Sequence, residues 1–157
     1  MQLRTKNKEL IGQAAGQTVE FGDKLKIGTF EITGPGEYEV GGLMVTSPEE
    51  NLYSIHSDST HVVFWRAYDG SPKTDSKDLG QVDALIIALK KDSSTLKNVL
   101  QTINELSPSA VIPVSPELLD ELVKAESAPT VKAETYKVEV VSEEKDRQII
   151  LLPCSQI

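Results

Sequence analysis

The sequence GPGEYEVGG, residues 34–42, contains four glycines and one proline around a short alternating segment. Within it, Tyr38 and Val40 alternate with Glu37 and Glu39, as side chains do along a half-exposed strand. The glycines could belong to a loop that holds a ligand, or to tight turns at a corner of a sheet. This choice decides whether the stretch indicates an enzyme.

A phosphate-binding loop requires glycines between a strand and a helix, so that the helix N-terminus faces the anion. Here the following segment LMVT, residues 43–46, is strand-like, and the glycine spacing matches neither the dinucleotide nor the P-loop pattern. Glycine adopts the positive φ angles of tight turns at the least cost. We therefore predict a structural corner of two turns and one short strand, made by Gly34, Pro35, Gly36, Tyr38, Gly41 and Gly42.

The composition predicts one soluble domain over residues 1–157. The formal net charge of -8, with scattered Lys and Arg, argues against binding to nucleic acid or to an anionic membrane. A single cysteine, Cys154, excludes an internal disulfide and fits a reducing compartment. No stretch has the length of a membrane span, and the N-terminus lacks the apolar region of a signal peptide. We expect a cytoplasmic protein.

The first part of the chain has the alternation and turn residues of β structure. A hairpin is predicted around Gly22-Asp23, and Pro48 with the acids after it is predicted to end the strand that follows the corner. The predicted strands cover residues 18–27 as that hairpin, then 29–33, 37–40, 43–46, 51–57 and 60–66, the last two joined at Asp58-Ser59.

The second part changes to a strand–helix–strand pattern. Residues 83–89 and 109–114 are apolar runs typical of buried strands, and residues 93–106 between them carry a helical apolar stripe capped by Asp92 or Ser93. This βαβ unit predicts two parallel strands. Beyond it, the sequence predicts a second helix starting at Ser115-Pro116, a linker at 127–130, and a terminal hairpin of 135–141 with 147–153 around the turn 142–146. The fold class is α/β, with mixed α+β character.

Two histidines lie on either side of the predicted turn at residues 58–59. If that turn forms, His56 and His61 lie directly across from each other on one face, where they could hold a metal ion. Without a third ligand at a convincing spacing, a surface histidine pair is the better interpretation. The loop of residues 67–80 supplies Asp69 as a further candidate ligand.

The segment ITGPGEYEVGGLMV, residues 32–45, resembles a recurrent segment of the metallo-β-lactamase-fold family, in the branch similar to ascorbate-6-phosphate lactonases. The order of hairpin, D-x-L-I-I strand, amphipathic helix and x-V-I-P strand is also similar. The resemblance implies a metallo-β-lactamase-like fold. It further implies a shortened one, because the resembling proteins have more chain before the corner than the 33 residues present here. Residues 1–13 are interpreted as a remnant hairpin of the first sheet.

The resemblance also implies a metal-dependent hydrolase, which uses an H-x-H-x-D-H loop, a bridging aspartate and a further histidine to make hydroxide at neutral pH. This sequence lacks H-x-H-x-D-H, and Ala67 and Ser115 occupy the positions of the bridging aspartate and the last histidine. Asp69 lies two residues from the first of these positions. We therefore expect no cofactor, and zinc only if the site has been rebuilt.

Three functions remain open at this stage. The first is a non-catalytic pseudoenzyme that binds a ligand or assembles with itself, since a shortened sheet would bare an apolar face and favour a homodimer or another protein partner. The second is a metal-dependent hydrolase with a rebuilt or partner-completed site, with candidates at His56, His61, Asp58, Asp69, Arg66 and Tyr68. The third is a subunit with Trp65, Arg66 and Tyr68 at an interface, unless Trp65 fills the core and Arg66 points to water.

Overall fold

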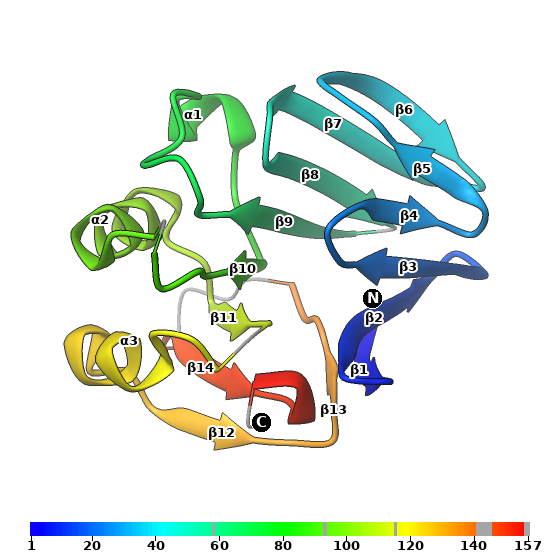
Figure 1. The fold of residues 1–157 in the computed structure, drawn as a ribbon. Coiled ribbons are helices and arrows are strands. Elements are labelled where there is room, and N and C mark those ends of the chain that lie inside the picture. The colour runs from blue at the N-terminus through cyan, green and yellow to red at the C-terminus, as the bar shows by residue number, and fades with distance from the viewer. Residues whose placement is uncertain (58, 93, 115, 141–145, 156–157) are drawn as a thin grey trace.

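The computed structural model describes residues 1–57, 59–92, 94–114, 116–140 and 146–155. Two β-sheets pack face to face, and the helices lie together on one flank of the molecule, against the second sheet (Figure 1). This is the strand-rich mixed α+β architecture that the sequence predicts. None of the helices in these residues is both long enough and apolar enough to cross a membrane.

The first sheet has six strands in the order β13-β1-β2-β3-β4-β5, all antiparallel. The predicted N-terminal hairpin is confirmed as β1 and β2, and the hairpin around Gly22-Asp23 is confirmed as β3 and β4, with Phe21 paired to Leu25. The strand bounds are Gln2–Lys6 (β1), Glu9–Ala14 (β2), Gln17–Phe21 (β3), Leu25–Ile27 (β4), Phe30–Ile32 (β5) and Thr135–Lys137 (β13).

The second sheet has eight strands in the order β12-β14-β11-β10-β9-β8-β7-β6. Strands β6 to β9 form an antiparallel meander, and β9, β10, β11, β14 and β12 run parallel to one another. The bounds are Gly36–Val40 (β6), Leu43–Glu49 (β7), Leu52–Ser57 (β8), Thr60–Arg66 (β9), Ala84–Ala88 (β10), Ala110–Pro113 (β11), Thr130–Lys132 (β12) and Gln148–Leu151 (β14). The predicted parallel βαβ unit is confirmed as β10, helix α2 (Leu96–Leu106) and β11.

Residues 34–42 form the turn, strand and turn that their glycine spacing predicts. Strand β6 is followed by a turn in which Gly41 and Gly42 have φ of 55° and 90°. Residues with a side chain adopt such angles only at a cost in free energy. The Tyr38 hydroxyl donates a hydrogen bond of 2.7 Å to the carbonyl of Gly34 and closes the corner on itself. The stretch therefore serves the sheet.

Two apolar layers hold the fold together. One lies between the sheets, and Phe64 at its centre contacts Phe21 of the first sheet edge-on at 5.3 Å and stacks on Tyr53 at 5.9 Å. The other lies between the second sheet and the helices, where Trp65 is buried with Leu85. Because side chains alternate along β9, adjacent residues of that strand supply both layers.

The predicted terminal hairpin is wrong. Residues 135–137 form β13 at the edge of the first sheet, whereas residues 148–151 form β14 inside the second sheet, parallel to β11. The predicted linker also contributes, because Thr130 begins β12 at the far edge of the second sheet. Strands β12 and β13 are each the outermost strand at one edge of their sheet, and β14, inside the second sheet, buries Ile149, Ile150 and Leu151. Residues 142–145 of the predicted turn lie outside the described part.

The predicted starts of both helices also need correction. Helix α3 spans Leu119–Glu126 and begins after Leu118, while Ser115, the predicted cap, lies outside the described residues. At α2 the N-cap position is Thr95, whose side chain makes no capping bond, and Asp92 does not cap it; Ser93 also lies outside the described residues. Ser94 instead donates to the carbonyl of Ala67 at 2.6 Å and accepts from the Lys90 N–H, which ties this loop to the end of β9.

Two smaller expectations are wrong as well. Strand β7 continues through Pro48 to Glu49, since a shift in register between Thr46 and Glu49 places the proline where no ladder bond is needed. The loop at 67–80 contains a short helix, α1 (Ser76–Leu79), whose N-cap Asp75 accepts a hydrogen bond from the Lys77 N–H.

The expected bare apolar sheet face is absent from the first sheet. The chain itself supplies six strands, and a cross-strand row of Arg4, Ile11, Glu20, Lys26 and Glu31 shows the character of the outward surface. Ile11 is only 4% exposed among charged neighbours, so their side chains cover it. The sheet is thus completed within one chain, with a polar outer face.

We predict that Gly42→Ala destabilises the fold by about 1–2 kcal/mol, because φ at this residue is strongly positive. Gly34→Ala is the matched control, since no heavy atom lies within 4 Å of a Cβ added there. Urea unfolding of both variants measures the difference. Equal stability of the two variants would contradict the assignment of the second turn as a strained corner.

Candidate functional site

Arg66, the last residue of β9, is the central side chain at the edge where the parallel strands end. It is 6% exposed and turns inward between the sheets, because it shares a face of β9 with Phe64. Its Nε and Nη2 groups donate to the carbonyl of Gly22 at 3.2 and 2.9 Å, and Nη1 donates to the Tyr53 hydroxyl at 2.9 Å. The guanidinium therefore bridges the first and second sheets.

The same guanidinium lies over two aromatic rings. Its Cζ atom is 5.2 Å from the ring centroids of both Tyr53 and Phe64, within the range of cation–π attraction. Among the described residues, no carboxylate forms a salt bridge with Arg66. The buried charge is therefore balanced by neutral acceptors and ring faces, which leaves it available to an anionic group from outside.

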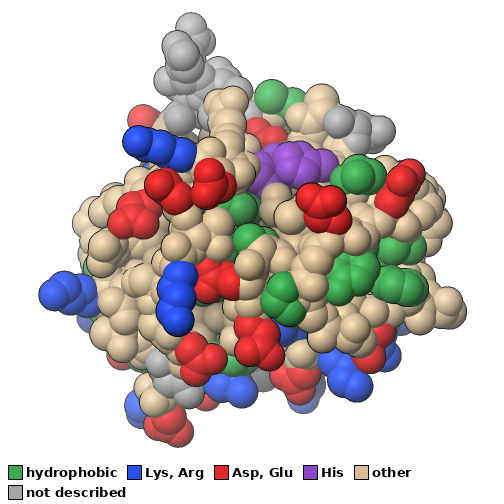
Figure 2. Space-filling view, turned by 90° about the horizontal axis from the view of Figure 1, so that it is seen from above, with side chains coloured by type: hydrophobic (Ala, Val, Ile, Leu, Met, Phe, Trp, Pro, Cys, Tyr) green, Lys and Arg blue, Asp and Glu red, His purple; other side chains and the backbone are tan. Residues whose placement is uncertain are grey.

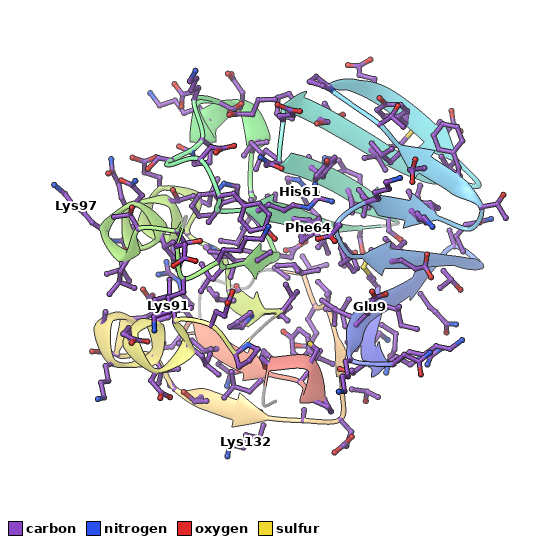
Figure 3. The ribbon with its side chains drawn as sticks, viewed as in Figure 1. Glu9, His61, Phe64, Lys91, Lys97 and Lys132 are labelled. Carbon is purple, nitrogen blue, oxygen red and sulfur yellow. The ribbon has the colours of Figure 1, made fainter. Side chains whose placement is uncertain are left out.

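Two neighbouring cavities share Arg66, Glu50 and Asn51 as lining residues. The larger, of about 430 Å³, opens between the sheets toward the β3–β4 loop, and the smaller, of about 260 Å³, opens toward the loop after β9. We call these two cavities together the Arg66 recess. A third cavity of about 170 Å³ lies beside it, lined from β2 by Glu9 and from β9 by Phe64, two residues labelled in Figure 3.

The other predicted interface residues have different surroundings. Trp65 is 3% exposed in the helix-side core, as the alternative interpretation held, whereas Arg66 does not point to water. Tyr68 is half-buried with the Lys90 Nζ atom 4.2 Å from its ring centroid. Burial raises the pKa of the Tyr68 hydroxyl, and the nearby Arg66 charge partly offsets this.

The histidine pair lies at the opposite end of the β8–β9 hairpin. His56 and His61 are directly paired across the strands, as predicted, and their rings stack at 4.0 Å. His61 is buried, and its Nδ1 lies 2.8 Å from the carbonyl of Gln81. A carbonyl can only accept, so Nδ1 carries the proton and Nε2 accepts from the Ser54 hydroxyl.

These residues do not fit a zinc site. Both ring nitrogens of His61 are already bonded, and Asp69 lies at the other end of the hairpin, 3.4 Å from the Asn51 amide. Asp58 lies outside the described residues. Across the residues that the structure describes, no three or more His, Cys, Asp or Glu side chains gather closely enough to hold a metal ion. Ala67, at the position where the resemblance implies a bridging aspartate, is a buried methyl group.

Figure 2 shows that the histidine pair reaches the surface between acidic side chains; of the two, His56 is exposed and His61 is buried. The pKa of His61 is subject to opposing influences. Burial has the largest effect and lowers the pKa of His61. The hydrogen bond to Gln81 raises it, the charge of the neighbouring His56 lowers it, and the charge of Asp83 raises it, so that the pKa is lowered overall. The Asp83 carboxylate also accepts the backbone N–H of His61 at 2.7 Å.

Sequence comparisons find no protein-family model that matches the chain and no match among curated proteins. A solved structure from Thermotoga maritima, described as a "putative zn-dependent hydrolase of the metallo-beta-lactamase superfamily", matches with a TM-score of 0.71. The match covers 97% of this chain and 98% of that one, at 16% identity. At this identity the likeness concerns the fold, and it confirms the prediction of a shortened metallo-β-lactamase-like architecture.

We predict that stability falls as pH drops below 6.5, the ordinary pKa of histidine, because His61 has a lowered pKa in the folded chain. The unfolded state then binds the proton first, so the contribution is full above that value and is lost until the folded pKa is reached. Urea unfolding at about pH 7 and about pH 5.5 measures the loss. His61→Asn should flatten this pH dependence, and an unchanged slope in that variant would refute the assignment.

Proposed function

We propose that this chain is a non-catalytic member of the metallo-β-lactamase fold, a pseudoenzyme that binds a small ligand without metal. The observation that carries this proposal is the buried Arg66 guanidinium at the edge of the sheets, next to the position where the resemblance implies a metal ligand. In this proposal the fixed positive charge of Arg66 takes the place of a bound metal ion. The single buried thiol of Cys154 is in keeping with a reducing cytoplasm.

Electrostatics supports a metal-free edge. A divalent ion placed about 6 Å from a guanidinium, at an effective dielectric constant of about 20, is repelled by roughly 5 kcal/mol. Metal-dependent hydrolases need the ion to coordinate a water molecule and lower its pKa, and a guanidinium cannot coordinate the water oxygen in this way. The recess is therefore suited to recognition of a ligand.

A hydrolase completed by a partner chain is the second candidate, and the description of the Thermotoga protein favours it. That function requires at least three metal donors at the Arg66 edge. Asp69 is the nearest candidate of those predicted from the sequence, and it is held by Asn51.

We predict that the purified chain binds no stoichiometric zinc at the Arg66 edge, because the donor set there does not fit. Elemental analysis and calorimetric titration with zinc measure this. His56→Gln is the control, since it removes weak surface binding by the histidine pair without touching the edge. Zinc at one per chain that persists in this control would favour the hydrolase.

We also propose that the chain assembles with itself, through a surface of the second sheet in place of the bare first-sheet face expected from the sequence. Strands β6, β7 and β8 extend the helix-side face of the second sheet beyond the helices (Figure 1). This part of the face carries a cross-strand row of Glu39, Met44 and His56. Met44 is 49% exposed at the middle of that row. A two-fold axis through Met44 would place each carboxylate opposite the histidine of the second copy, which makes the face self-complementary.

We predict a homodimer at high concentration that Met44→Glu converts to a monomer, because the two new carboxylates, one from each copy, would then meet at the axis. Val131→Glu is the matched control, as Val131 is also exposed but lies on β12 at the other edge of the sheet. Size-exclusion chromatography with light scattering measures both. A monomeric parent chain would refute this surface.

A further inference from the structure

We propose that the Arg66 recess binds a small zwitterion of the α-amino acid class, with the ligand carboxylate on Arg66 and its ammonium group toward the acidic rim. This inference rests on the proposed function, since it names the ligand class of the same site. It is carried by the unused donors of a buried guanidinium and by the charges around it.

The donor count of Arg66 leaves room for a ligand. A guanidinium has five N–H groups in one plane. Three hydrogen bonds are formed inside the protein, two to the carbonyl of Gly22 and one to the Tyr53 hydroxyl. Two N–H groups therefore remain on a side chain that lines both cavities. A carboxylate matches this geometry, because a planar fork can donate to both of its oxygens.

The position of the guanidinium is fixed before any ligand arrives. Hydrogen bonds to Gly22 and Tyr53 and the ring contacts with Tyr53 and Phe64 hold it in place. Binding then costs little side-chain entropy on the protein, which is the advantage of a preorganised group. The larger cavity, about 430 Å³, is within the usual size range of small-molecule sites.

The rim selects against a simple anion. Besides Arg66, the larger cavity is lined by Lys24 and by three acids, Asp23, Glu31 and Glu50. Lys24 pairs with Glu31 at 3.2 Å, so the charges of those two residues largely offset each other. Asp23 and Glu50 remain as exposed carboxylates near the buried cation. They repel a phosphate dianion and attract an ammonium group, so the combination favours a ligand with both charges.

Isothermal titration calorimetry of the full chain tests this with L-alanine and L-glutamine as probes. Acetate supplies the carboxylate alone, ethylammonium the cation alone, and inorganic phosphate the dianion. We expect the amino acids to bind, acetate to bind more weakly, and ethylammonium and phosphate to give no signal. Binding of phosphate or acetate but not of the amino acids overturns the zwitterion and leaves the proposed binding function standing. Silence from every probe overturns the inference, whereas stoichiometric zinc at this edge overturns the proposed function.

Two variants locate the binding. Arg66→Lys keeps the charge but loses the fork, so we expect about a tenfold loss of amino-acid affinity. Asp23→Asn removes one charge from an exposed rim position and spares the core. It should weaken amino-acid binding and strengthen acetate binding, a reversal that a structural role would not produce. If Arg66→Lys fails to fold by circular dichroism, the Asp23→Asn reversal alone decides, and its absence overturns the inference.

Discussion

The hydrogen bonds from the Arg66 guanidinium to the carbonyl of Gly22 are the interaction that joins the two sheets at the edge where β9 ends. It joins the end of β9 in the second sheet to the β3–β4 loop of the first, 44 residues earlier in the chain. Beneath it, Phe64 contacts Phe21 across the same gap. The edge next to Ala67 thus carries a fixed cation that lies over two aromatic rings. The rings of Tyr53 and Phe64 attract the Arg66 guanidinium, and the guanidinium in turn covers these rings and shields them from water.

The parts of the fold that the sequence predicted are those in which local pattern and global burial agree. Residues 84–88 and 110–113 are apolar without interruption, and strands covered on both faces require that pattern. The pairing of His56 with His61 followed from one turn position, because the register of a hairpin is set by its loop. The glycine spacing at residues 34–42 likewise favoured a turn, a short strand and a second turn, because glycine adopts positive φ angles most easily.

The parts that could not be predicted depend on partners distant in sequence. Residues 135–137 and 148–151 are both short alternating strands, and nothing local says that one belongs to each sheet. Arg66 is similar. Its alternation with Val62 and Phe64 is consistent with an inward face, but arginine is usually exposed. The Gly22 carbonyl that satisfies the buried guanidinium belongs to the other sheet. The tautomer of His61 depends in the same way on Gln81, 20 residues away.

A guanidinium at this edge changes the chemistry that the fold can perform. A metal ion accepts water as a ligand and turns it into a nucleophile, whereas arginine stays protonated and offers only hydrogen bonds in a fixed plane. The nearby Tyr68 has a raised pKa, so it too stays protonated at neutral pH. His61, which is neutral and could act as a base, is at the far end of the hairpin and already accepts a bond from Ser54. Among the described residues, the polar group fixed at this edge is thus the Arg66 guanidinium, which can orient an anionic group, and the proposal of ligand recognition is built on that property.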